Sequence, residues 1–363
     1  MDYEIDFLAV GEESKGGDAI ALRYGNLAGS REEQTVIVID GGYTDTGQQL
    51  VNHITRHYKT NRVDHVVSTH PDRDHASGLK IVVEQLSVGQ LLMHQPWLHS
   101  ETLTEARATG FRTLAANERF QESLRQASDL ETIAREKGIA IIEPFAGMAT
   151  TDGVFRILGP SRLYYEDLLG EILAPAGVRE AAKSLLASVV EKAREMLVKE
   201  TLEHETLRDD GVTTPSNNTS VLSMLEVDGK KSLLTGDAGI PALEHAVGRL
   251  EANGFKPGDL RFVQAPHHGS RRNVGPSVLD RLLGAKGRTE CTATAFLSAP
   301  KKNPEHKHPA KKTLNAFTRR GYAVHVTEGQ AKWHYSAGVP DRDGYSASTP
   351  APFHDFVEED SDA

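Results

Sequence analysis

Six consecutive residues, His70 to His75, hold two imidazoles and two carboxylates in the pattern His-x-Asp-x-Asp-His. Side chains of these types cannot all be buried cheaply, because each would need a partner or would have to give up its charge. A divalent cation supplies that partner for His70, Asp72, Asp74 and His75 at once. The pattern therefore predicts a metal site, and the alternative interpretation is a polar loop that happens to be rich in histidine and aspartate.

The stretch before this motif, residues 63–69, is a β-branched run that predicts a buried strand with the motif at its carboxyl end. Functional groups in α/β sheets collect at that end of the strands. The same placement recurs, because polar residues follow four further predicted strands: Asp40, His94, Asp237 and the pair His267-His268. These complementary ligands favour a metal site. Asp40 is suited to orient a ligand histidine, whereas His94 is equally well explained as a hydrogen-bonded loop residue.

The composition is that of an ordinary soluble globular protein, with 363 residues, 38% hydrophobic and 25% charged. The chain has no apolar run of about 18 residues and its N-terminus lacks the features of a signal peptide, so we expect a cytoplasmic protein with no membrane partner. The single cysteine, Cys291, cannot form an internal disulfide and is expected to be a small buried hydrophobe.

Charge is distributed unevenly along the chain. The formal net charge of −10 argues against a surface coated with nucleic acid. Between Lys301 and Arg320, however, seven Lys or Arg residues stand against one acid, Glu305. The last nine residues carry five acids, which predicts a disordered acidic tail.

The spacing of apolar residues predicts a helical segment over residues 101–137 and a further pair of helices at 164–208, interrupted at Pro175-Ala176-Gly177. We interpret residues 164–208 as an insertion that forms a cap or an interaction surface for a protein partner. The predicted organisation is one domain over residues 1–340, which contains this insertion, and a tail over residues 341–363.

Several motifs, each after a predicted strand, resemble the metallo-β-lactamase superfamily in type and order. They are Asp40-Gly-Gly, His70-x-Asp72-x-Asp74-His75, Gly236-Asp237 and His267-His268-Gly-Ser. A second set is similar to the hydrolase domain of ComEC-type competence proteins: Gly17-Asp18-Ala19, Asn217-Asn218-x-Ser220, Leu-Leu-Thr-Gly-Asp237, Pro-His-His-Gly-Ser270 and Asn303…His308-Pro309. The likeness runs from about residue 5 to residue 336, without the insertion.

This resemblance implies an α/β fold, a four-layer αββα sandwich of two sheets with helices outside and a site along one edge. Its ligand set, carried over by position, assigns His70 and Asp72 to a first ion, Asp74 and His75 to a second, Asp237 to a bridge and His268 to a further ligand. His267 is then expected beside the ligands or facing the substrate.

The chain departs from the family pattern at one ligand of the first ion. The superfamily usually supplies a histidine from a Gly-Pro-Gly-His segment, and the corresponding stretch here is Leu158-Gly159-Pro160-Ser161. The first site is then expected to be weak, completed by water, or filled by His94. Either one ion or an asymmetric pair of ions is compatible with this set.

Imidazole and carboxylate ligands without cysteine fit Zn²⁺ or Mn²⁺. The expected chemistry is hydrolysis by a metal-activated water, with Asp74 as the group that orients this water or accepts its proton. His267 and His308 are further catalytic candidates. Other candidates, on the substrate side, are Asn218, Ser220, Ser270, His94 and Lys301, and their alternative role is to cap loops and turns.

The leading hypothesis is a phosphodiesterase or nuclease that acts on DNA. The basic stretch Lys301–Lys312 supports it, because backbone phosphates need local cations. The negative net charge and the scarcity of aromatic residues near the motifs oppose it. One alternative is the same chemistry on a small phosphodiester, nucleotide or lactone, with residues 164–208 as a lid. Another is a partner-binding subunit whose metal centre is secondary.

Overall fold

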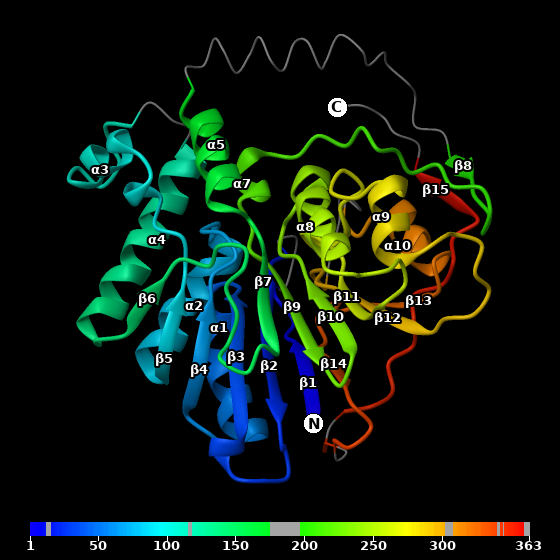
Figure 1. The fold of residues 1–363 in the computed structure, drawn as a ribbon, viewed down its shortest axis with the longest axis horizontal. Helices are drawn as coiled ribbons and strands as arrows, with labels where there is room; N and C mark the ends of the chain where they lie inside the picture. Colours follow the sequence, from blue (N-terminus) through cyan, green and yellow to red (C-terminus); the bar gives the residue numbers. More distant parts are fainter. Residues whose placement is uncertain are drawn as a thin grey trace.

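Two β-sheets packed face to face form the centre of the molecule in this computed structural model (Figure 1). The structure describes residues 1–11, 16–114, 118–174, 197–301, 308–339, 342–343 and 345–358. The first sheet has the strand order β14-β1-β2-β3-β4-β5-β6, and the second has the order β13-β12-β11-β10-β9-β7. The strands of the first sheet are β1 (Asp2–Phe7), β2 (Ala19–Gly25), β3 (Gln34–Gly41), β4 (Arg62–Val67), β5 (Ser87–Leu92), β6 (Ala140–Ile142) and β14 (Lys332–Tyr335). Those of the second are β7 (Phe155–Gly159), β9 (Leu222–Val227), β10 (Lys230–Leu234), β11 (Leu260–Gln264), β12 (Ala293–Leu297) and β13 (Tyr322–Val326).

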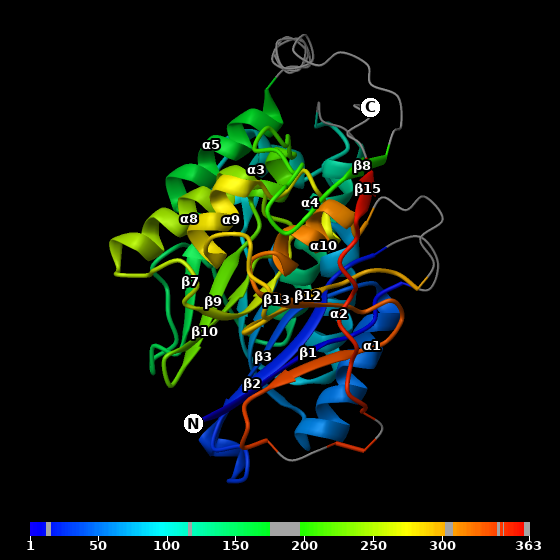
Figure 2. The same ribbon diagram turned by 90° about the vertical axis from the view of Figure 1, so that its right-hand side faces the viewer.

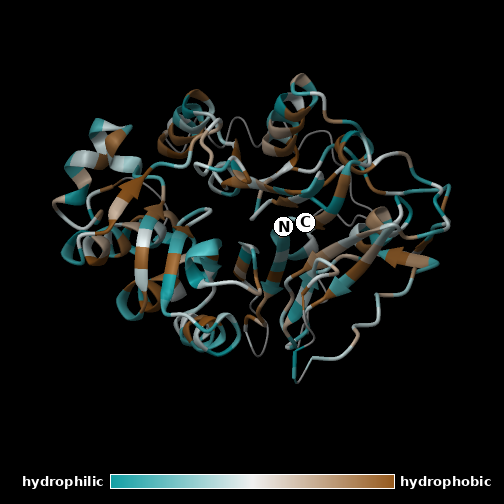
Figure 3. Cartoon of the chain, turned by 60° about the horizontal axis from the view of Figure 1, so that its bottom comes forward, coloured by the Kyte–Doolittle hydropathy of each residue, from teal (hydrophilic) through white to brown (hydrophobic). Residues whose placement is uncertain are grey.

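The alternation of side chains along each strand produces the layers. On β3, Ile37 and Ile39 belong to the core between the two sheets, whereas Val36 and Val38 pack against the outer helices. Successive side chains of a strand point to opposite faces, so a continuous β-branched run serves both cores. Figure 3 shows brown, hydrophobic stretches recurring along the strands.

Helices cover the outer face of each sheet, as Figure 2 shows for α8 on one side and for α1 and α2 on the other. The helices on the side of the first sheet are α1 (Thr44–His53), α2 (Arg73–Gln85), α3 (Glu101–Arg107), α4 (Glu118–Glu136) and α5 (Arg162–Leu173). Those that follow in the second half are α7 (Pro215–Asn218), α8 (Ile240–Ala252), α9 (Pro276–Leu283) and α10 (Lys311–Thr318). The predicted four-layer αββα sandwich is therefore confirmed.

The segment at 164–208 is described only in part. The first of its two predicted helices corresponds to α5, which Ser161 caps by accepting a hydrogen bond from the backbone of Tyr164. The second falls mainly on residues 175–196, which lie outside the described residues. The structure resumes at β8 (Leu197–Lys199). The division into a hydrolase domain with an insertion stays a prediction.

The end of the chain differs from the disordered tail expected for residues 341–363. Residues Phe356–Glu358 form strand β15, which pairs with β8 in an antiparallel two-stranded sheet. Val357 is fully buried, and the backbone of His354 donates a hydrogen bond to the side chain of Asn315. Burial of an apolar side chain and pairing of the backbone explain why this acidic stretch is structured.

Cys291 is exposed, so the expectation that it is buried is wrong. It lies two residues before the start of β12, where the strand has not yet entered the core. Across the described parts of the chain, no helix combines the length and the apolar character needed to span a membrane.

Candidate metal centre

The His-x-Asp-x-Asp-His motif lies where strand β4 gives way to helix α2. Strand β4 is an interior strand that pairs with β3 and β5, and it ends at Val67. Helix α2 begins at Arg73, and Asp72 is its N-cap residue although its side chain makes no capping hydrogen bond. His70 and Asp72 therefore lie in the turn, and Asp74 and His75 lie on the first turn of the helix.

Close packing of the backbone brings strand β3 against this helix. A Cβ atom on Gly41 would lie 2.4 Å from the backbone nitrogen of Leu79, and one on Gly78 would lie 2.0 Å from the carbonyl oxygen of Gly41. Only glycine fits at both positions. Asp40, at the end of β3, adopts a left-handed φ of 54° and turns its carboxylate toward the motif.

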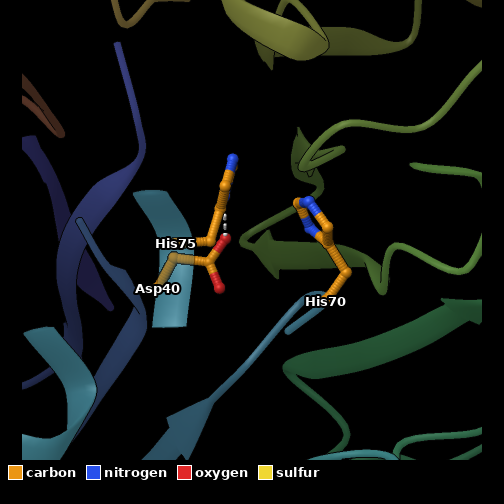
Figure 4. Close-up of side chains that lie close together, drawn as sticks. All are labelled: Asp40, His70 and His75. Carbon is orange, nitrogen blue, oxygen red and sulfur yellow. Dashed lines mark hydrogen bonds and ion pairs between the residues drawn. The ribbon is translucent and has the colours of Figure 1, made fainter. Parts of the chain in front are cut away.

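Asp40 holds His75 in place (Figure 4). Its Oδ2 atom lies 2.8 Å from Nδ1 of His75, and the same carboxylate accepts hydrogen bonds from the backbone nitrogen and the hydroxyl of Thr69 at 2.8 and 2.6 Å. Metal-ligating histidines commonly use one ring nitrogen for such a carboxylate and the other for the ion. This geometry is the one expected of an orienting residue.

His75 is the centre of a cluster contributed by both halves of the chain. Its Nε2 atom lies 3.3 Å from Oδ1 of Asp237, and its ring stacks on that of His268 with centroids 5.6 Å apart. Nε2 of His268 in turn lies 3.8 Å from Oδ2 of Asp74. Asp237 follows β10 and His268 follows β11, so the second sheet supplies these two residues. Three sets of mutually close ligand atoms all contain His75: with Asp40 and His70, with Asp74 and His268, and with Asp18 and Asp237.

The buried atoms that converge here lack hydrogen bonds. Among the described residues, Nε2 of His70, Nε2 of His75, both ring nitrogens of His268 and Oδ1 of Asp237 are buried without a hydrogen-bond partner. A buried polar atom left unpaired costs about 1–3 kcal/mol, so five of them in one place are unusual for a purely structural cluster. Lone pairs from two or three imidazoles and a carboxylate match the ligands of a divalent ion. The residues present therefore fit a metal ion.

The electrostatics of the cluster favour positive charge. Burial opposes protonation of His75, but Asp237 and Asp40 raise its pKa well above the ordinary value. Against the same effect of burial, the side chain of Asp74 and the charge of Asp237 raise the pKa of His268 to about 9. Burial likewise opposes ionisation of Asp237, yet His267 and His75 lower its pKa well below the ordinary value. A divalent ion would take the place of the protons on these imidazoles.

Asp72, predicted as a ligand of a first ion, has other partners. Arg119 donates a hydrogen bond to Oδ2 at 2.6 Å, and Ser123 donates one to Oδ1 at 2.8 Å. Nε2 of His70 lies 4.0 Å from Oδ2 of Asp72 and 3.8 Å from Oδ2 of Asp237. The four residues of the motif thus divide into two environments.

His267 faces the cluster from the second sheet. Nε2 lies 3.7 Å from Oδ2 of Asp237, and Nδ1 lies 3.0 Å from the amide nitrogen of Asn217 and 3.1 Å from the amide oxygen of Asn273. Its ring stacks on that of His308, with centroids 5.4 Å apart. His267 and His308, both predicted catalytic residues, therefore lie side by side, and His267 is the one next to Asp237.

Three predicted substrate residues make contacts within the protein. The side-chain oxygen of Asn218 accepts a hydrogen bond from the backbone of Gly239. The hydroxyl of Ser220 accepts one from the backbone of Asp237 and lies 3.4 Å from Nδ1 of His70. The hydroxyl of Ser270 accepts one from the backbone of Arg272. These contacts position the loops around the cluster, and roles toward substrate stay predictions.

The last two predicted substrate residues, Lys301 and His94, lie outside the metal-binding sets of the described residues. Lys301 is exposed, and its side chain passes close to Gly329. The basic stretch that follows it, at 302–307, lies outside the described residues. His94 lines a small pocket together with His70, and its ring stacks on Tyr165 with centroids 4.3 Å apart.

His94 should make the protein sensitive to acid. Burial lowers its pKa to about 3, so in the folded state it stays neutral while an unfolded chain binds a proton below about pH 6.5. Its contribution to stability is therefore complete above pH 6.5 and is lost as the pH falls toward 3, by about 1.4 kcal/mol per pH unit. In urea unfolding of the metal-free protein at pH 7.5 and 5.5, we expect His94→Phe to lose less stability than the wild type.

The matched control is His245→Phe. His245 is exposed and its ring lies over Tyr164, 4.2 Å between centroids, so its replacement should leave the pH dependence unchanged. Equal losses of stability in wild type and His94→Phe would refute the prediction.

Sequence reasoning missed three residues of the cluster. Asp18 is buried, accepts a hydrogen bond from Gln264 at 2.8 Å and lies 3.9 Å from Nδ1 of His75. The motif Gly17-Asp18-Ala19 contained the signal for this residue, since it places an acid just before a strand. Arg119 and Ser123 gave no signal, because they lie in a charged helical stretch where such residues are common.

One family model and two solved structures are similar to this chain. The family model described as the metallo-beta-lactamase superfamily matches residues 31–283. Two solved structures are similar at low identity. A Thermotoga maritima protein assigned to the metallo-beta-lactamases is 12% identical, with 51% of this chain and 92% of that chain covered and a TM-score of 0.29. Unliganded yeast PDE1 is 11% identical, with 91% and 98% covered and a TM-score of 0.41. No curated protein matches the chain. The family match includes the motif, Asp237 and His268.

Proposed function

Because this chain belongs to the metallo-beta-lactamase superfamily, whose members are mostly metal-dependent hydrolases, we propose that it is a metal-dependent phosphodiesterase that acts on DNA. The observation that carries the proposal is the convergence of unpaired buried atoms from both sheets, Nε2 of His75, Nε2 of His268 and Oδ1 of Asp237. Two imidazole nitrogens and a carboxylate oxygen in one buried place are ligands that suit a divalent ion.

The proposed ligands of the ion are Asp74, His75, Asp237 and His268. This set of nitrogen and oxygen donors suits Zn²⁺ or Mn²⁺. A bound divalent ion would acidify a coordinated water and polarise a phosphoryl oxygen. Asp40 keeps His75 in the required orientation through Nδ1, so the ring presents Nε2 to the ion.

Two further groups are placed to move protons. Burial opposes ionisation of Asp74, but the side chain of His268 and the charge of His75 hold its pKa below the ordinary value. It is therefore a carboxylate at neutral pH that can orient an attacking water and accept its proton. His267 has a pKa lowered by burial, so it is neutral at pH 7, and its side chain is 27% exposed. Held between Asn217 and Asn273, this neutral imidazole can accept a proton or form a hydrogen bond with the substrate.

The choice of a phosphodiester rests on positive charge and on sequence likeness. The side chain of Arg119 is 72% exposed and lies against Asp72 at the edge of the cluster, where it can meet a phosphate oxygen. The ComEC-type motifs and the basic stretch at 301–312 support DNA as the substrate. The net charge of −10, which opposes binding of a long polyanion, favours a second candidate, a small phosphodiester or lactone.

A cleavage panel tests the proposal. Protein loaded with Zn²⁺ or Mn²⁺ is incubated with single-stranded DNA, duplex DNA, RNA, bis(p-nitrophenyl) phosphate and a simple lactone. The Asp74→Ala, His75→Ala double variant removes two proposed ligands. Its matched control is Asp129→Asn, which removes an exposed carboxylate that pairs with Lys80 at 2.7 Å, away from the cluster. We expect the wild type and Asp129→Asn to cleave DNA and the double variant to be inactive. Hydrolysis of the lactone alone would favour the second candidate, and no hydrolysis of any substrate would refute both.

A further inference from the structure

Asp72 differs from Asp237 because both of its oxygens already accept hydrogen bonds from protein groups outside the ligand set. Oδ2 accepts a hydrogen bond from the guanidinium of Arg119 at 2.6 Å, and Oδ1 accepts one from the hydroxyl of Ser123 at 2.8 Å. The Asp72 side chain is only 4% exposed. By contrast, Oδ1 of Asp237 is buried without a hydrogen bond among the described residues. Asp72 is therefore held by two donors of helix α4, whereas the near partner of Oδ1 of Asp237 is the imidazole of His75, at 3.3 Å, which is itself a proposed ligand.

Helix α4 supplies both partners of Asp72. Arg119 and Ser123 are four residues apart, so their side chains lie on the same face of the helix. The hydroxyl oxygen of Ser123 also lies 3.0 Å from the backbone oxygen of Arg119, so its single proton is shared between this carbonyl and Asp72. A guanidinium stays charged at every physiological pH, so Asp72 faces a permanent cation.

Among the described residues, no set of mutually close ligand atoms joins His70 with Asp72 or with His94. At the position where the family pattern has a histidine, the hydroxyl of Ser161 caps helix α5. His94 stacks on Tyr165 and belongs to none of the ligand sets among the described residues. On this side of the cluster, Nε2 of His70 and both ring nitrogens of His94 are buried without a hydrogen-bond partner among the described residues, but no ligand set there joins the two histidines.

We propose that Arg119 takes the place of the first metal ion, so that the centre binds one ion through Asp74, His75, Asp237 and His268 while the guanidinium on Asp72 supplies the second positive charge. A phosphoryl group bound at the single ion would then meet Arg119 rather than a second ion. A guanidinium holds phosphate oxygens through two parallel hydrogen bonds, so it orients the substrate as well as balancing its charge. This inference rests on the proposed metal centre and not on the identity of the substrate.

Metal content tests the inference without reference to activity. Wild type, Arg119→Ala and Arg119→Gln are equilibrated at the same series of free Zn²⁺ concentrations, and zinc per chain is measured by inductively coupled plasma mass spectrometry and by native mass spectrometry. The matched control is Arg135→Ala, which removes an arginine of the same helix with a similar exposed fraction, 64% against 72%, whose partner is Glu131. Circular dichroism monitors the fold of each variant.

We expect one zinc per chain in wild type and Arg135→Ala, and two in both Arg119 variants, because removal of the guanidinium leaves Asp72 buried with an uncompensated charge. Two ions of similar affinity in the wild type would overturn the inference, and so would a single ion in both Arg119 variants. Absence of zinc from the wild type would instead refute the metal centre of the proposed function, and the inference with it. A catalytic readout complements these results: Arg119→Gln should raise KM for a phosphodiester more than it lowers kcat if the side chain binds substrate.

Discussion

Asp237→Asn should remove the metal ion and lower the rate of phosphodiester hydrolysis by at least about 100-fold, the upper end of the effect seen for residues that merely support a ligand. Asp237 lies within 3.3 to 3.8 Å of three imidazoles, those of His75, His70 and His267. Its carboxylate provides the negative charge that draws positive charge to this point, and asparagine keeps the shape but not the charge. Zinc content and initial rates measure the two effects.

The control for Asp237→Asn is again Asp129→Asn, whose exposed carboxylate lies on α4 and contacts Lys80 of α2. It should keep both the ion and the activity. Retention of one zinc per chain and of activity within about two-fold in Asp237→Asn would contradict the ligand assignment.

Asp40→Asn should weaken the binding of the metal ion and also lower the stability of the metal-free protein. The carboxylate accepts three hydrogen bonds within 2.8 Å, from the backbone and hydroxyl of Thr69 and from Nδ1 of His75. An amide can accept at only one atom, so at least one buried donor would lose its partner, at a cost of about 1–3 kcal/mol. Loss of the partner of His75 should lower zinc affinity by about 10- to 100-fold. Chelator competition gives the affinity, and urea unfolding of the metal-free protein gives the stability.

Asp6→Asn separates the two effects. Asp6 is another buried carboxylate, which accepts a hydrogen bond from Tyr58 and pairs with Arg342. Its replacement should destabilise the protein without changing zinc affinity. If Asp40→Asn lost stability and kept the wild-type zinc affinity, the role of Asp40 in orienting His75 would be refuted.

The fold and most of the cluster could be predicted because their signals are local in the sequence. The β-branched run of β3 ending in Asp40-Gly-Gly, and the motif after β4, are each contained in a few residues. Asp237 and His268 were also found, since each directly follows a predicted strand. The expected positions of these side chains at strand ends agree with the cluster in the structure.

The partners of Asp72 could not be predicted, for a physical reason. In the sequence Asp72 is equivalent to Asp74, with the same side chain two residues away. What distinguishes them is the packing of α4 against α2, a tertiary contact between segments about 50 residues apart that places Arg119 and Ser123 on one carboxylate only. The disorder expected at the chain end is contradicted at β15 for a similar reason, because its pairing with β8 is set by the tertiary structure.

Because the proposed ligands come from two sheets, binding of the ion should also stabilise the fold. Asp74 and His75 follow β4 of the first sheet, whereas Asp237 and His268 follow strands of the second, so a complete set exists only when both halves of the chain have folded together. An ion that binds only the folded protein at a concentration 100 times its Kd stabilises it by about 2.7 kcal/mol. The survival of this protein against cellular proteases would then depend on the supply of the metal, and starvation for the metal would lower its abundance as well as its activity.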